Sequence, residues 1–467
     1  MNWQPVEIVG GAYADDTRPW TSQDTVNWLP LRAERPGTKT AWILRSPPGL
    51  VPFCETQARP VRGMHNAEGL RLVVVGRTLY RVNANKTVTA LGTIPGVGRV
   101  SISHNQTAAG NEVVIANGQS GYVYNTAANS LVQITDDAFP GSRVVDFIDS
   151  YIAGVDPYGR FWFISDTAQA TQYNTLDRQD AESQPDKIVT LIVTGNQVLV
   201  FGERTGEFFS NTGQATNTFA RVDNVSMSIG CASPYALARL DNTVYWLGHD
   251  GIVYRLQGNL PVRVSTSALE GAIADLDWSN AFAMTFEDRG HKVFYLTFPD
   301  GQTFGFDVPA QEWHRRESYG LKRWRINALI RWGARWYAGD FQNGRIYELD
   351  WDTLTEAGQP LVSQRRTAVS HADGNPIIVD GIKLFFDVGR SGAANDDHYT
   401  SIRYSDDGGH NWSSAAVESI GGAGEYQTSV EVRQLGMATE RVWEVEVSSP
   451  AKRDLIGASW LAGVGQA

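Results

Sequence analysis

The chain has 467 residues, of which 42% are hydrophobic, and a formal net charge of −11. A chain of this length can bury more than one hydrophobic core, so we expect a large repeat domain and a smaller second domain. The acidic balance argues against a protein that grips nucleic acid through its overall field, although it leaves room for a local basic patch. Cys54 and Cys231 form neither a disulfide framework nor a zinc spacing, and no apolar run approaches the roughly 20 residues that span a bilayer.

Residues 1–60 read as an irregular segment. Proline and glycine interrupt it at Pro36-Gly37 and at Pro47-Pro48-Gly49, and isolated tryptophans are scattered between these turns. Pro-Pro-Gly favours an extended stretch followed by a tight turn. We therefore predict an N-terminal arm that packs on the domain that follows.

From Val61 onward, short runs of β-branched and aromatic residues alternate with turn residues. The clearest unit is Pro234–Thr266, where turns at Asp241-Asn242, at 248–251 and at Gly258-Asn259 separate four such runs. Four strands in roughly 35 residues is the size of one propeller blade, and a single blade cannot bury both of its faces. The same signal recurs at 72–82, 113–124, 146–164, 188–209, 282–306 and 326–349.

These repeats predict an all-β chain with a β-propeller of six or seven blades over residues 61–358. A solenoid of sheets is the alternative, but the short glycine-rich turns and the uneven spacing favour a closed ring. Helix is nearly absent, and Ser267–Trp278 is the best short candidate. Past residue 358 about seven alternating runs in roughly 100 residues predict a C-terminal β-sandwich over 359–467.

Several local strings resemble a known family, the packaged-DNA stabilisation proteins that form the tail hub, or nozzle, of short-tailed bacteriophages. The most specific string is Ala-Glu-Ser-Gln-Pro-Asp at 181–186, and the resemblance covers most of the first 190 residues. The residues that carry the resemblance are Arg45, Pro48, Gly49, Trp162, Asp166, Ala181, Glu182, Ser183, Gln184, Pro185 and Asp186.

The resemblance implies a structural virion protein that assembles as a homohexamer below the portal and its adaptor. Such a ring would extend the channel for double-stranded DNA without reading its sequence, and would help retain the packaged genome. The partners implied are the portal-adaptor protein, a tail plug or needle, and tail fibres or spikes, with no membrane. The place implied is the tail of the virion, after assembly in the host cytoplasm.

Motifs for catalysis do not stand out. Ser405–Trp412 fits the Asp-box pattern of sialidases, in which the aspartate holds a turn and takes no part in catalysis. The acidic pairs, such as Asp136-Asp137 and Asp396-Asp397, are adjacent and so point to opposite faces of an extended chain. We therefore predict no enzyme, no catalytic residues, no metal and no cofactor.

Two other classes of function stay open, a carbohydrate-active propeller of the sialidase type and a propeller scaffold that binds proteins. Carboxylates or arginines that converge on the propeller axis would favour the enzyme.

The segment from Trp313 to Trp336 mixes basic and aromatic residues. This mixture is typical of surfaces that grip nucleic acid, but arginines between blades or subunits also pair with carboxylates. Both interpretations stay open, with contacts between blades or subunits favoured over DNA. The candidates for a DNA or subunit contact are Arg315, Arg316, Lys322, Arg323, Arg325 and Arg331.

Overall fold

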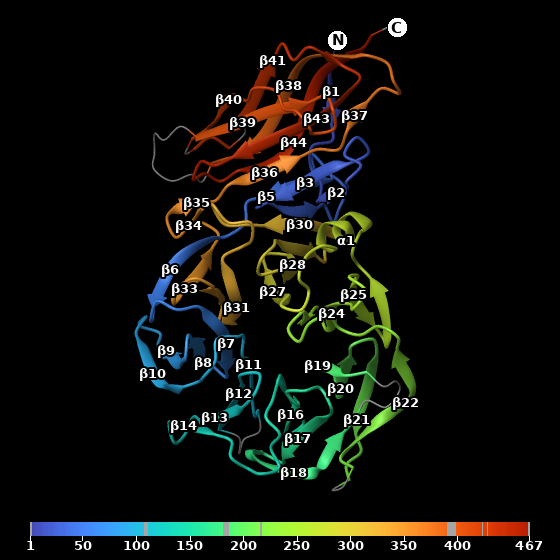
Figure 1. The fold of residues 1–467 in the computed structure, drawn as a ribbon. Coiled ribbons are helices and arrows are strands. Elements are labelled where there is room, and N and C mark those ends of the chain that lie inside the picture. Colours follow the sequence, from blue (N-terminus) through green and yellow to red (C-terminus); the bar gives the residue numbers. More distant parts are fainter. Residues whose placement is uncertain are drawn as a thin grey trace.

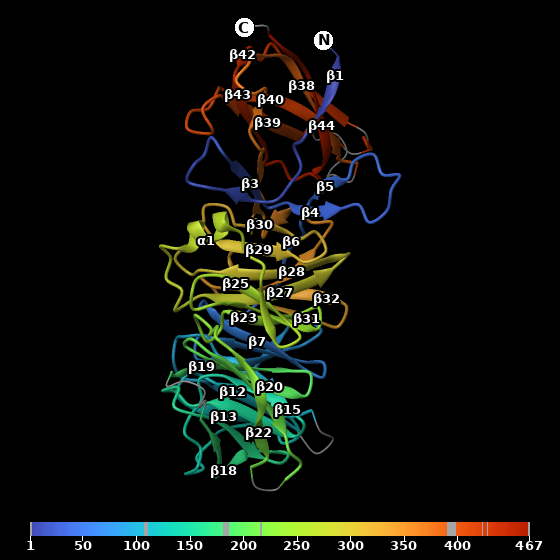
Figure 2. The same cartoon turned by 90° about the vertical axis from the view of Figure 1, so that its right-hand side faces the viewer.

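The computed structural model describes residues 2–106, 111–180, 186–214, 217–389, 398–422, 424–426 and 428–465. Its elements lie in two bodies, a ring of sheets and a sandwich that sits at the rim of the ring and carries both termini (Figure 1). Figure 2 shows that the two bodies stack along one long axis. The fold is thus the expected β-propeller followed by a β-sandwich.

Seven four-stranded antiparallel meanders make up the ring within the described residues. Blades one to four are formed by β7 (Val61–Ala67), β8 (Leu70–Val75), β9 (Thr78–Val82) and β10 (Val88–Thr93); β11 (Ser101–His104), β12 (Glu112–Ala116), β13 (Gly121–Asn125) and β14 (Ser130–Gln133); β15 (Val145–Ile148), β16 (Tyr151–Val155), β17 (Trp162–Asp166) and β18 (Gln169–Gln179); and β19 (Ile188–Thr194), β20 (Gln197–Gly202), β21 (Gly206–Asn211) and β22 (Phe219–Met227).

Blades five to seven follow the same pattern. They are formed by β23 (Leu237–Leu240), β24 (Thr243–Leu247), β25 (Val253–Gln257) and β26 (Leu260–Arg263); β27 (Phe282–Asp288), β28 (His291–Thr297), β29 (Thr303–Asp307) and β30 (Glu312–Arg316); and β31 (Ile326–Trp332), β32 (Arg335–Asp340), β33 (Arg345–Asp350) and β6 (Gly49–Glu55). The seven repeats noted in the sequence correspond to these seven blades.

Blade five shows how the sequence builds this architecture. Asp241 and Asn242 both have positive φ angles, 52° and 58°, as a tight hairpin turn between twisted strands requires. Successive side chains of β24 then point to opposite faces of the sheet. Tyr245 packs in a buried cluster with blade six, whereas Trp246 packs in a buried cluster with blade four. One strand therefore supplies the core on both sides of its blade.

A strand from the N-terminal segment closes the ring. β6 pairs antiparallel with β33 and becomes the outermost strand of blade seven. Gly49 begins this strand where the backbone passes so close to Thr353 and Thr355 that a Cβ atom would collide with their carbonyl oxygens. Leu50 is fully buried in the core shared by blades six and seven.

The remaining N-terminal strands belong to the sandwich. One sheet contains β4 (Leu29–Arg32), β5 (Trp42–Arg45), β44 (Asp454–Val464), β38 (Ile377–Asp387), β41 (Thr428–Arg433), β1 (Trp3–Val6) and β42 (Met437–Ala438). The facing sheet contains β2 (Tyr13–Ala14), β3 (Ser22–Val26), β36 (Ser363–Arg366), β37 (Ser370–His371), β43 (Glu440–Val447), β39 (His398–Ser405) and β40 (Ala416–Gly421). Their inner faces share a core that includes the buried Trp28 and Trp443.

β3 joins the two bodies. It lies beside β30 of blade six on one side and pairs with β36 of the sandwich on the other, so one hydrogen-bonded sheet runs from the ring into the sandwich. Residues 1–60, predicted to form an arm that packs on the propeller, contribute strands to both bodies. The short β34 (Thr355–Glu356) and β35 (Gln359–Pro360) follow β33 at this junction.

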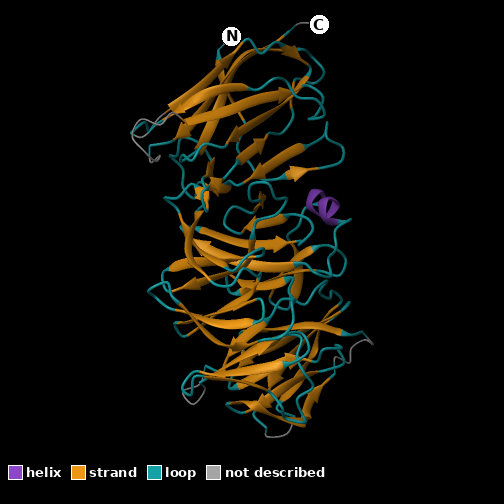
Figure 3. Ribbon diagram, turned by 60° about the vertical axis from the view of Figure 1, so that its left-hand side comes forward, coloured by secondary structure: helices purple, strands orange, loops and turns teal. Residues whose placement is uncertain are grey.

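One helix occurs within the described ranges, α1 (Ser267–Ile273), in the region where the sequence favoured one (Figure 3). Thr266 caps it, since its side chain accepts a hydrogen bond from the amide of Leu269. The described part of the chain contains no helix long and apolar enough to cross a bilayer.

We predict that Leu50→Ala destabilises the ring by about 2–5 kcal/mol, because it removes a fully buried side chain from the closing strand and leaves a cavity. Urea unfolding followed by tryptophan fluorescence measures the loss. Leu260→Ala is the matched control, because Leu260 is 68% exposed, and it should shift the midpoint little. Equal effects of the two variants would contradict the role of β6.

Stability should also depend on His314, which lies fully buried in β30. Burial lowers the pKa of His314 from its ordinary 6.5 to about 3, with smaller contributions from His291 and Arg316. Below pH 6.5 His314 therefore binds a proton in the unfolded chain but not in the folded chain. Its contribution to the free energy of unfolding is fully present above pH 6.5 and declines as the pH falls toward 3.

The expected loss is about 2 kcal/mol between pH 7.5 and pH 5 for this one residue. Comparing urea midpoints of the wild type and of His314→Gln at the two pH values isolates this contribution. A variant with the wild-type pH dependence would show that His314 does not cause it.

Candidate functional site: the two mouths of the propeller axis

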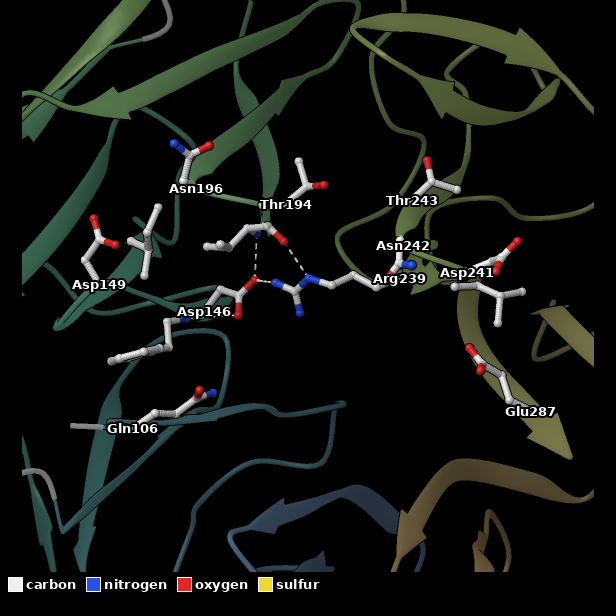
Figure 4. Close-up of a pocket in the computed structure, with 15 residues that line it drawn as sticks. Gln106, Asp146, Asp149, Thr194, Asn196, Arg239, Asp241, Asn242, Thr243 and Glu287 are labelled. Carbon is white, nitrogen blue, oxygen red and sulfur yellow. Dashed lines mark hydrogen bonds and ion pairs between the residues drawn. The ribbon is translucent and has the colours of Figure 1, made fainter. Parts of the chain in front are cut away.

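The innermost strands of five blades end around one mouth of the axis. A cavity of about 700 Å³ opens there, and Figure 4 shows the polar side chains that surround it. Four acidic residues line it, namely Asp146, Asp149, Asp241 and Glu287, against one arginine, Arg239. We call this end the acidic mouth.

The acidic side chains brace neighbouring blades. Asp146 of blade three accepts a hydrogen bond of 2.8 Å from the amide of Val193 in blade four and pairs with Arg239 of blade five (Figure 4). Asp149 accepts from the side-chain amide of Asn211 at 2.7 Å, and Asp241 pairs with Lys292. Because the carboxylates of Asp146, Asp149 and Asp241 are bound to partners on other blades, these three do not form an acid–base pair.

The opposite mouth lies where the innermost strands begin. A cavity of about 590 Å³ there is lined by four arginines from four blades, Arg62, Arg99, Arg143 and Arg323, and by Tyr235. Its single acidic side chain is that of Asp300. We call this end the arginine mouth, and it has the opposite charge to the acidic mouth.

Side chains span the bore at the arginine mouth. Tyr235, which precedes β23, donates its hydroxyl to the carbonyl oxygens of Arg99 and Arg143, at 3.3 and 3.4 Å, on blades two and three. Arg99 reaches back to Asn327 of blade seven at 3.2 Å, and its guanidinium carbon lies 3.7 Å from the ring centre of Phe282 in blade six. The axis of a single propeller is therefore not an open tube.

Arginines do converge on the axis, which was the feature expected of a sialidase-type enzyme, and the wall of the propeller holds each of them by at least one hydrogen bond. Arg62 is 2% exposed and donates to the carbonyl oxygens of Gly76, Ile94, Pro95 and Gly98. Burial raises the pKa of the Tyr235 hydroxyl, so it stays protonated and is not a nucleophile. The described residues also contain no cluster of three His, Cys, Asp or Glu suited to a metal ion.

The Asp-box turn is stabilised by hydrogen bonds between its own residues. The carboxylate of Asp407 accepts hydrogen bonds from the amides of His410 and Asn411, at 3.0 and 2.8 Å, and from the hydroxyl of Ser405. These bonds stabilise the ionised form and lower the pKa of Asp407. The box is thus a structural turn in the sandwich.

The residues behind the family resemblance are mostly structural as well. Trp162 is buried against Phe209, and Asp166 is exposed at the end of β17. Arg45 donates to the carbonyl of Arg289, the carbonyl of Pro48 accepts from Arg316, and Gly49 opens the closing strand.

The most specific string of that resemblance runs from Ala181 to Asp186. Asp186 fixes the turn before β21 by accepting from Thr205 and from the amide of Arg204. Ala181, Glu182, Ser183, Gln184 and Pro185 lie outside the described residues.

The basic segment splits into internal and exposed residues. Arg315 forms a two-pronged ion pair with Asp24, at 3.0 and 2.6 Å, and Arg325 pairs with Asp340 at 2.9 Å. Lys322 and Arg331 are exposed.

Two arginines of the segment, Arg316 and Arg323, have buried side chains whose contacts lie within this chain. Arg316 is 1% exposed and lies 3.4 Å from Glu356, and Arg323 is 5% exposed and donates to the carbonyl oxygens of Trp324 and Ile326. The Arg316 guanidinium lies at the junction between the ring and the N-terminal segment, where it also donates to the carbonyl oxygen of Pro48, whereas the Arg323 guanidinium lines the arginine mouth.

Sequence reasoning missed Tyr235, Arg62, Arg99 and Arg143, because each stands alone in its own repeat. A signal was present nonetheless. All four lie within two positions of the start of an innermost strand, so aligning the seven repeats on one another would have brought these positions together.

Comparison with known proteins identifies the family. A family model described as Bacteriophage P22 Gp10, beta-propeller, matches residues 4–354, and one described as Bacteriophage P22 Gp10, beta-sandwich, matches residues 363–460. This chain belongs to the P22 Gp10 family. The two matches meet near the junction formed by β34 and β35, and the first also covers the N-terminal strands β2–β5 that the structure places in the sandwich.

A P22 Gp10 relative is the tail hub protein gp10 of Salmonella phage P22, which is 23% identical over 306 residues. The match covers 60% of this chain and 63% of that protein, so it spans less than two thirds of the relative.

Two solved structures resemble the chain more distantly. The computationally designed protein Ika8 is 12% identical, with a TM-score of 0.38, and the match covers 64% of this chain and 99% of that one. Virginiamycin B lyase from Staphylococcus aureus is 7% identical, with a TM-score of 0.46, and the match covers 63% of this chain and 97% of that one. Likeness at this level transfers no function.

We predict that Arg316→Met lowers stability by about 3–5 kcal/mol, because it leaves the fully buried carboxylate of Glu356 without its guanidinium partner. The exposed neighbour Lys322 provides the control, and Lys322→Met should change stability by less than about 0.5 kcal/mol. Urea unfolding of both variants measures the difference. An Arg316→Met protein of unchanged stability would refute the internal role of this arginine.

Proposed function

We propose that this chain is a structural subunit of a bacteriophage tail hub, located in the tail of the virion and without enzymatic activity. The observation that carries the proposal is the pair of family matches, which cover the propeller and the sandwich in order. The name of the P22 relative, a tail hub protein, supports the same function.

We further propose that six copies form a ring and that DNA passes between the subunits instead of through any one propeller. Tyr235 and Arg99 span the bore of the single ring, so a duplex needs a channel built from outer surfaces. At −11 per chain, six copies make a strongly acidic assembly. An acidic wall repels the phosphate backbone, so DNA slides past it without binding.

The architecture suits a part that bears force and docks other proteins. The sheet that continues from blade six into the sandwich couples the two bodies through backbone hydrogen bonds. In the proposed hub, the ring and the sandwich offer separate surfaces to the portal-adaptor, to a plug or needle, and to fibres or spikes. Assembly takes place in the host cytoplasm and involves no membrane.

Electron microscopy of particles that carry this chain tests the proposal. We expect six copies below the adaptor around a channel whose wall has a net negative charge, and particles without the chain should lose packaged DNA. A particle tail without this chain would overturn the assignment as a hub. A neutral or basic channel wall would overturn only the sliding mechanism.

A further inference from the structure

The arginine mouth carries positive charge that the protein itself does not balance. Among the described residues, Arg62, Arg99, Arg143 and Arg323 form no ion pair within 4.0 Å, whereas Arg315, Arg316 and Arg441 are each paired with a carboxylate. Asp300 is the single acidic residue that lines the cavity. Four cations against one carboxylate is a marked excess on a chain whose overall charge is −11.

Two of these cations crowd the same aromatic ring. The guanidinium carbons of Arg99 and Arg323 lie 3.7 and 5.3 Å from the ring centre of Phe282. Burial is the main cause that lowers the pKa of each arginine to about 10, and the positive charge of Arg323 is a smaller cause of the lowering at Arg99. Both therefore stay charged at neutral pH, and the neighbouring carboxylates, carbonyl oxygens and aromatic rings offset only part of the hydration that they lose.

The guanidinium groups are held in place with donors to spare. Arg323 is anchored by the carbonyl oxygens of Trp324 and Ile326, and Arg143 by those of Pro157 and Ile188. The Nη1 atom of Arg99 donates to Asn327, while its buried Nε has no hydrogen-bond partner. This N–H group is a donor that an oxygen acceptor on a ligand could satisfy.

Arg62 differs from the other three. Its Nε, Nη1 and Nη2 atoms all donate to backbone carbonyl oxygens, so it shapes the wall and adds charge without offering donors. Arg99, Arg143 and Arg323 are the residues whose remaining N–H groups are available to a ligand.

We propose that the arginine mouth is a binding site for an oxyanion, either a phosphate or a carboxylate group. Planar guanidinium groups with fixed orientation bind both groups through paired, charge-assisted hydrogen bonds. The cavity of about 590 Å³ has room for a free anion or for an acidic side chain on a peptide. The inference rests on this cavity alone and does not depend on the role in a tail hub.

Isothermal titration of the full chain in a buffer of low ionic strength tests the site. Two probes are used. Inorganic phosphate represents a free anion, and the capped peptide acetyl-Gly-Glu-Gly-amide represents an acidic side chain on a backbone. The probe that binds with the higher affinity indicates the source of the anion. We expect saturable binding of at least one probe and a rise in melting temperature that sodium chloride of equal ionic strength does not reproduce.

Two substitutions should move the affinity in opposite directions. Arg99→Gln removes a charge and donors and should weaken binding about tenfold or more, whereas Asp300→Asn removes the one competing carboxylate and should tighten it several-fold. Arg331→Gln is the control, since Arg331 is exposed and lies outside the cavity lining, and its affinity should match the wild type.

If Arg99 had a structural role instead, Arg99→Gln would melt at a lower temperature than the wild type in the absence of anion. If Arg99→Gln melts at the wild-type temperature or higher without anion, because one of two crowded cations is gone, its weaker binding reports the lost contact. Failure of both probes to bind, or equal binding by the wild type and Arg99→Gln, overturns the proposal.

Discussion

The fold depends on the pairing of the N-terminal segment with strands made far later in the chain. β6 supplies the fourth strand of blade seven, and without it the hydrogen-bonding edge of β33 would be exposed and the ring would stay open. β3 lies between the outermost strand of blade six and the sandwich. The buried Arg365 reinforces this junction, because it donates to the carbonyl oxygens of Ile8 and Gly11 and to the side chain of Thr25.

This arrangement makes one hydrogen-bonded body out of two domains. Two arginines of the basic segment serve the same junction, since Arg315 pairs with Asp24 in β3 and Arg316 with Glu356 in β34. A protein built in this way keeps its sandwich at a fixed place on the rim of the ring (Figure 2). Its axis, by contrast, is polarised, with an acidic mouth where the inner strands end and an arginine mouth where they begin.

Much of the architecture follows from local chemistry, and so the sequence predicts it well. Turn residues such as Asp241 and Asn242 adopt positive φ angles that favour tight hairpins, and the alternation of buried residues between them sets which side chains face each neighbouring blade. Seven repeats, the sandwich and the short helix near Ser267 could be located from such patterns.

What the sequence does not predict is pairing between distant segments. Asp24 lies 291 positions from Arg315, so a run of arginines and tryptophans looks like a nucleic-acid surface until the fold brings in its partner. The strand that closes the ring has the same local pattern as any other, and only the ring geometry decides where it pairs. The arginines of the axis are single residues in separate repeats and gather only when the blades close.

The closing strand also sets the order in which the molecule becomes complete. Glu55 and its partner Arg345 are 290 positions apart, so on the ribosome β6 emerges long before β33 is made. Six blades have to stack while both edges of β6 are still unpaired. The chain segment between β6 and β33, which closes last, is among the longest loops that any pairing in the chain closes. The ring is therefore completed only after synthesis has passed the last blade. A truncated chain that stops short of residue 345 leaves β6 unpaired and prone to aggregation and does not form a smaller ring.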